Sequence, residues 1–202
     1  MKTLSRVYDT YGQASSVVTE LEAAGVPNSE ISLLANKHVS AAHDEVEEVS
    51  GARNGAGIGA ALGGAGGLLA GLGLIAIPGI GPVVALGWFA ATAVGAVAGA
   101  ATGGIIGALT DIGVSKEHAE VYSEAIRRGG TLVTVRVDDA NAARAEAILN
   151  RHTPVDPTAR LAEYRRLGWK GYDPKAAPYA ISQEERDRIR APYPRFEDRR
   201  SA

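Results

Sequence analysis

Three closely spaced small residues give the chain its best match to a catalytic or binding motif. Gly55, Gly57 and Ala60 fit the G-x-G-x-x-G/A spacing of dinucleotide-binding loops. Such a loop follows a buried strand, and an acidic residue about 20 positions further on binds the ribose. Here residues 45–53 are acidic and polar, and residues 54–110 contain no Asp or Glu. The match therefore predicts no nucleotide site, and we expect no cofactor.

The remaining candidates for chemistry are histidines and carboxylates in polar surroundings. The four histidines are His38, His43, His118 and His152. An acidic run follows His43 as far as Glu48, but its spacing matches no metal-ligand pattern. We interpret residues 38–50 as a solvated connector or as the first turns of a helix that leads to the hairpin. Neither a Ser-His-Asp set nor a phosphate-binding loop ending in Lys-Ser/Thr is visible. We therefore expect a non-enzymatic protein without catalytic, cofactor-binding or metal-binding residues.

The dominant feature is an uncharged segment, residues 54–110, which holds no Lys, Arg, Asp, Glu or His. Glycines recur at every fourth position in two series: Gly55, Gly59, Gly63, Gly67 and Gly71, then Gly95, Gly99, Gly103 and Gly107. A spacing of four places the glycines of each series on one face of a helix, where another backbone can approach closely. The pattern predicts two helices, residues 54–76 and 83–110, that pack through their glycines. Pro78, Gly79, Gly81 and Pro82 would form the tight turn between them.

The predicted helices are apolar on all sides, which is typical of membrane spans or of the core of a large assembly. Each has the length of about 20 residues that a bilayer requires. Trp88 and Phe89 follow the turn, where aromatic rings would suit a membrane interface. The alternative is a soluble particle in which several hairpins pack against each other. A pore is disfavoured because Thr92 and Thr102 are the main polar residues that could line it.

The flanks of the uncharged segment predict a small α+β domain. Strands are expected at 4–8, 31–35 and 131–137, helices at 13–24, 116–128 and 140–151, and a short edge strand at Val155. The first flank is a βαβ unit, and neither flank can bury a core alone. Together they predict a ferredoxin-like sandwich with its helices on one face of the sheet, interrupted by the glycine-zipper hairpin.

Composition divides the chain into four parts. Residues 1–53 hold the first half of the α+β domain and the acidic connector, residues 54–110 the hairpin, and residues 111–155 the second half. Residues 156–202 form a tail rich in proline, aromatic residues and arginine, with possible helices at 159–167 and 182–190. The tail is expected to dock on a protein surface, such as a neighbouring subunit, or to be partly disordered. Acidic residues are interleaved with its arginines, so nucleic acid is not an expected partner.

The order of these parts resembles the bacterial general stress, or heat- and low-temperature-induced, protein family. The resemblance rests on residues 25–34, the glycine-rich block 55–107 and residues 129–135, with weaker similarity at 155–169. It implies a stress-linked, non-enzymatic membrane protein and transfers no catalytic residues.

The expected function is therefore that of a membrane protein whose hairpin anchors it and self-associates. The N-terminus lacks the apolar core of a signal peptide, and a hairpin returns the chain to its starting side, so both termini are expected in the cytoplasm. The expected partners are further copies of the chain and the lipid bilayer. A cytoplasmic soluble assembly is the alternative, and a small-molecule sensor built on the α+β head is less favoured.

Overall fold

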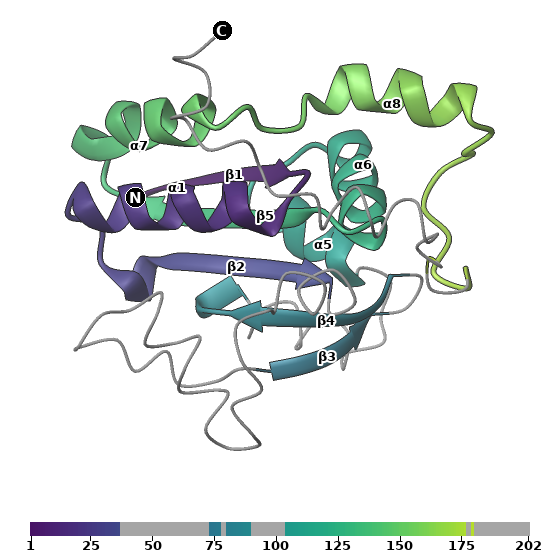
Figure 1. Cartoon of the computed structure of the whole chain (residues 1–202), viewed down its shortest axis with the longest axis horizontal. Coiled ribbons are helices and arrows are strands. Elements are labelled where there is room, and N and C mark those ends of the chain that lie inside the picture. Colours follow the sequence, from purple (N-terminus) through teal and green to yellow (C-terminus); the bar gives the residue numbers. More distant parts are fainter. Residues whose placement is uncertain (37–72, 78–79, 90–103, 177–178, 180–202) are drawn as a thin grey trace, which may run out of the picture.

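The computed structural model describes residues 1–36, 73–77, 80–89, 104–176 and 179, and these form a mixed α/β structure (Figure 1). The N-terminal elements are β1 (Lys2–Tyr8), α1 (Tyr11–Ala23), the 3₁₀ helix η1 (Asn28–Glu30) and β2 (Ile31–Asn36). The middle of the chain contributes β3 (Gly73–Ile77), β4 (Gly81–Leu86), α5 (Gly104–Asp111) and α6 (Lys116–Arg127). The last elements are β5 (Thr131–Val137), α7 (Asp139–Arg151) and α8 (Pro157–Arg166).

One five-stranded sheet, in the order β1-β5-β2-β4-β3, forms the middle layer, and every neighbouring pair in it is antiparallel. The last strand of the sequence, β5, lies between β1 and β2, with Leu4 opposite Val135 and Leu33 opposite Val133. The two strands of the first βαβ unit, β1 and β2, are therefore separated by β5. The two halves of the domain that were predicted to need each other are joined through β5.

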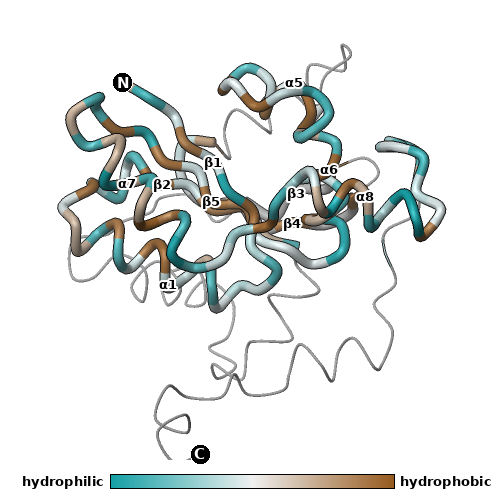
Figure 2. The backbone as a smooth tube through the Cα atoms, turned by 90° about the horizontal axis from the view of Figure 1, so that it is seen from above, coloured by the Kyte–Doolittle hydropathy of each residue, from teal (hydrophilic) through white to brown (hydrophobic). Residues whose placement is uncertain are grey.

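Helices cover both faces of the sheet. On one face, α1 and α7 pack over the first hydrophobic cluster, to which Val133 and Val135 contribute. On the other face, α5 and α6 pack over the second cluster, which includes Leu34 and Leu132. The expectation of helices on one face holds for α1 and α7 and is wrong for α6. Strands β2 and β5 are consequently hydrophobic on both sides, and hydrophobic stretches occupy the middle of the molecule in Figure 2.

Local sequence signals set the helix boundaries of the two flanks. Thr10 and Gln13 form a reciprocal capping box at the start of α1. The side chains of Ser115, Asp138 and Asp156 accept backbone hydrogen bonds at the starts of α6, α7 and α8. After α1, Gly25 adopts a positive φ of 89°, which ends the helix. The three strands and three helices predicted for the flanks are confirmed to within a few residues, whereas Val155 belongs to no strand of the structure.

The prediction of two long helices in the uncharged segment is wrong where the structure describes it, at residues 73–76 and 83–86. These residues form β3 and β4 instead, with Ile75 opposite Val83. Short apolar runs have no periodicity that separates a strand from a buried helix. Here β-branched residues and the turn between the two runs favour the hairpin, whose strand β4 pairs with β2. At the far end of the segment, α5 is helical as predicted for residues 104–110.

Substitution of Gly87 tests the attachment of β4 to β2. Gly87 has a φ of 82°, and a Cβ atom there would collide with the carbonyl oxygen of Ile31 and the side chain of Ser32. We expect Gly87→Ala to lower the free energy of unfolding by about 2 kcal/mol or more, as measured by urea denaturation. The control is Gly12→Ala in α1, where a Cβ meets nothing within 4 Å and helix propensity favours alanine. Equal stability of the two variants would contradict this structure around Gly87.

Buried tyrosines predict a loss of stability at high pH. Burial raises the pKa of Tyr8 and of Tyr122 above the ordinary value, and the Tyr8 hydroxyl donates a hydrogen bond to the Leu149 carbonyl at 2.7 Å. Tyrosines of the unfolded chain ionise near pH 10. The stabilising contribution of the neutral, buried tyrosines should therefore be fully present below that pH, and the free energy of unfolding should fall above it. Tyr8→Phe should cost about 1 kcal/mol at neutral pH and make the alkaline fall shallower in urea titrations at several pH values. An unchanged pH slope would contradict the role of Tyr8.

Candidate functional site: attachment of the uncharged segment

The structure describes one of the nine glycines expected to pack helices together. Gly107 lies in α5, and no atom beyond its own helix backbone and chain neighbours lies within 4 Å of the position that its Cβ would take. It therefore makes no close helix contact among the described residues. The other members of the two series, Gly55, Gly59, Gly63, Gly67, Gly71, Gly95, Gly99 and Gly103, lie outside the described residues.

The predicted turn is in the expected place but joins two strands. The backbone N–H of Ile80 donates to the carbonyl of Ile77 at 3.1 Å, and Ile80 is fully buried. Gly81 and Pro82 are the first residues of β4, whereas Pro78 and Gly79 lie outside the described residues. The apolar character of the turn is explained by its burial in the second hydrophobic cluster.

After β4 the chain is fixed to the beginning of β2 by polar contacts. The Phe89 backbone N–H donates to Ser32 Oγ at 2.9 Å, and Trp88 Nε1 donates to the Glu30 carbonyl at 3.2 Å. The guanidinium of Arg136 lies 4.4 Å from the centre of the Trp88 ring. These contacts place both aromatic residues in the α+β head, where Phe89 is buried in its core. From the sequence, both aromatic residues were expected at a membrane interface, and no local pattern indicated the contact of Trp88 with Arg136.

Helix α5 attaches the other end of the uncharged segment. Ile105, Ala108 and Leu109 are buried in the second cluster together with residues of α6. The helix ends where Val114 N–H returns to the carbonyl of Leu109 at 3.0 Å and Gly113 takes a φ of 92°. Residues 104–109 therefore belong to the head.

The strand register shows where the undescribed parts of this region begin and end. Asn36, the last residue of β2, lies opposite Val83, and Gly73 lies opposite Ala85 on the other side of β4. Asn36 and Gly73, the described residues on either side of 37–72, are therefore two strands apart, about 10 Å across the sheet. Phe89, the last described residue before 90–103, lies beside Ser32, near the opposite end of β2. Asn36 and Phe89 consequently lie near opposite ends of β2.

The described part of the tail packs on its own chain. Helix α8 packs against α6, where Val121 of α6 shares a cluster with Tyr164 and Trp169, whose rings meet edge to face with centres 5.8 Å apart. The Arg128 guanidinium lies 4.5 Å from the Tyr164 ring, and burial raises the pKa of the Tyr164 hydroxyl. Helix α8 begins at Pro157, two residues before the predicted start. Docking of the tail on a neighbouring subunit stays a prediction for the residues beyond Tyr179.

The histidines do not form a metal site in the described part of the chain. His118 belongs to the first turn of α6, and His152 Nε2 lies 2.9 Å from Glu20 Oε1. No group of three or more His, Asp or Glu residues that could hold a metal ion occurs among the described residues. His38 and His43 lie outside them.

A buried carboxylate in α6 binds the two arginines at the end of that helix, and these arginines contact Tyr164 and Tyr179 of the tail. Glu124 is almost fully buried, and its two oxygens accept from Arg127 Nε at 3.0 Å and Arg128 Nε at 2.7 Å. Glu124→Ala should lower the free energy of unfolding by about 3 kcal/mol in urea denaturation and speed proteolysis within α8. The control Glu163→Ala removes an exposed pair with Arg160 and should cost less than about 1 kcal/mol. Similar losses in the two variants would contradict the importance of the Glu124 pair.

Within the described parts of the chain, no helix is both long enough and apolar enough to cross a bilayer. The chain matches no family model, no curated protein and no solved structure.

Proposed function

We propose that this chain is a non-enzymatic, stress-linked protein that assembles with further copies of itself through its uncharged segment, while the α+β head faces the cytoplasm. The observation that carries the proposal is the absence of charge from residues 54–110, together with the regular glycines of that segment. Residues 73–77, 80–89 and 104–110 contribute to the head, and residues 54–72 and 90–103, which lie outside the described residues, are equally free of charge. Apolar stretches of this length need an apolar environment.

Self-association is favoured over a two-helix membrane hairpin by the lengths that remain. A spanning helix needs about 20 apolar residues, and residues 90–103 are too few to supply one. Contact between copies has no minimum length, and glycines at every fourth residue allow close backbone approach. Membrane attachment is the second candidate, supported by residues 54–72, which contain no charge and approach the length of one span.

We also infer that β1, α1, β2, β5 and α7 follow the ferredoxin-like plan. The position of β5 between β1 and β2 is the split βαβ order of that plan. The Val155 N–H donates to the Val7 carbonyl at 2.7 Å, which supports the expected short edge strand beside β1. The uncharged segment is then an insertion between two strands of a known plan. Because this fold serves many activities, it supports no particular enzyme or sensor.

Leucine substitutions in the glycine series test the assembly. Gly63→Leu combined with Gly99→Leu fills positions where we propose close contact, so the particle mass should fall in detergent-free sedimentation. The control Gly12→Leu adds the same side chain at an exposed position of α1 and should leave the mass unchanged. An unchanged mass in the double variant would exclude the glycines as contact surfaces.

Fractionation of the native chain without detergent separates the two candidates. We expect a soluble particle of uniform mass larger than one chain. Recovery only from the membrane pellet would support lipid attachment through residues 54–72 instead. A soluble monomer would contradict both.

A further inference from the structure

We propose that a pocket between the end of α1 and the beginning of α7 binds a small anionic amphiphile, such as a medium-chain carboxylate. The pocket has a volume of about 300 Å³ and lies on the face of the sheet opposite α5 and α6. This volume is at the lower end of the range of about 300–1,000 Å³ for small-molecule sites. The inference concerns the head alone and does not depend on the proposed assembly.

The inner wall of the pocket is apolar because core residues reach it. Val137, Ala145 and Ile148 are buried residues of the first hydrophobic cluster, and all three line the pocket. Val26 and Pro27, in the turn after α1, form the facing wall. An alkyl chain bound here would leave water and contact the apolar side chains that also stabilise the fold.

Most of the charged side chains at the pocket have a partner in the fold. Glu30 and Arg136 form an ion pair with a separation of 2.7 Å, and Asp138 accepts the backbone N–H of Asn141 at the start of α7. Arg144 is exposed and makes no hydrogen bond or ion pair with any described residue. The lining also holds the α-ammonium group of Met1, so two positive groups without an ion pair among the described residues, Met1 and Arg144, stand beside one such carboxylate, Asp138.

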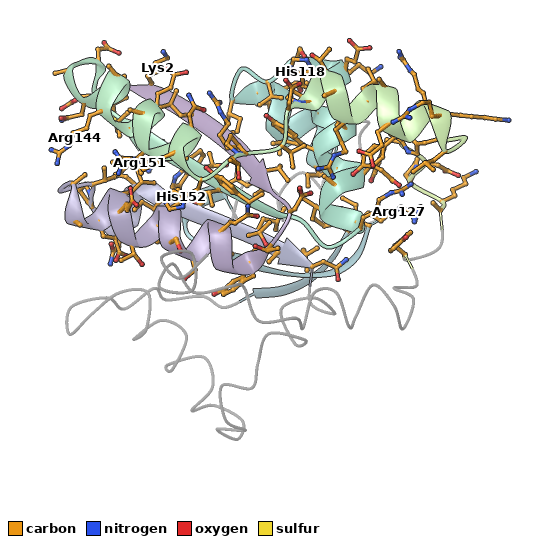
Figure 3. All side chains as sticks on the ribbon, turned by 45° about the horizontal axis from the view of Figure 1, so that its top comes forward. Lys2, His118, Arg127, Arg144, Arg151 and His152 are labelled. Atoms are coloured by element: carbon orange, nitrogen blue, oxygen red, sulfur yellow. The ribbon has the colours of Figure 1, made fainter. Side chains whose placement is uncertain are left out.

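The position of Arg144 sets it apart from the other basic residues of α7. Figure 3 shows Arg144 between the ends of α1 and α7, whereas Arg151 and His152 lie nearer the middle of α1. Arg151 and His152 both contact the Glu20 carboxylate, at 2.7 and 2.9 Å. A guanidinium binds a carboxylate through two parallel hydrogen bonds, so Arg144 can orient an anionic head while the tail enters the apolar wall.

We expect the affinity of the pocket to depend on the chain length and on the charge of the ligand. Each methylene buried in the pocket should tighten binding about fourfold, so octanoate should bind about 15-fold tighter than hexanoate. Octan-1-ol and octyltrimethylammonium, which have the same chain but no negative charge, should bind at least about tenfold more weakly than octanoate.

Methyl NMR shifts of the full-length protein test the site because they report its location directly. Titration with octanoate should shift the Ile148 and Ala145 methyl signals, and Arg144→Gln should weaken this binding about tenfold while Arg144→Lys retains part of it. The matched control is Arg166→Gln, an exposed arginine of α8 without a described ion pair, which should leave the affinity unchanged. Val26→Phe, which fills the pocket from the turn, should abolish the shifts without changing the unfolding midpoint by more than a few degrees.

Three results would overturn the proposal. The first is octanoate shifts confined to methyl groups away from α7. The second is equal binding of octanoate and octyltrimethylammonium, which would remove the role of charge. The third is unchanged affinity in both Arg144→Gln and Val26→Phe.

Discussion

Burial of β2 and β5 on both faces is the constraint on which the other elements depend. Every residue of β2 is buried, and β5 has a single partly exposed residue, Arg136. Helices α1 and α7 cover one face, but the other face needs apolar cover of its own. The uncharged segment supplies part of this cover, through the buried turn at Ile80, through Phe89 and through α5, and α6 supplies the rest. Part of the uncharged segment therefore belongs to the hydrophobic core of the head.

The elements that could be predicted are those with local signals at their ends. Helices α1, α6 and α7 begin at side-chain caps, and β5 alternates clearly in sequence, so their positions follow from short stretches of chain. The placement of β5 between β1 and β2 depends on contacts between residues more than 90 positions apart, which no local pattern encodes. The same holds for the pairing of Glu30 with Arg136.

The central segment was harder to predict because its composition is compatible with two different structures. Apolar residues with regular glycines suit a helix pair in lipid, and apolar β-branched residues around a Pro-Gly turn suit a buried hairpin. The second explanation holds at 73–77 and 81–86, where β4 gains a full strand partner in β2. Tertiary pairing of this kind outweighs any preference of the isolated segment.

Glycine shows the same ambiguity at single positions. At Gly87 the absence of a side chain is required, because β2 approaches too closely for a Cβ atom and φ is positive. At Gly107, which belongs to the regular series, the space around the missing side chain is open among the described residues. Spacing identified Gly107 and passed over Gly87. Glycines at a regular interval thus indicate which face of a helix lacks side chains. Whether another segment packs closely against that face depends on the neighbouring chain. For Gly107 a neighbour would have to come from outside the described head, which is the physical link between this open face and the proposed assembly.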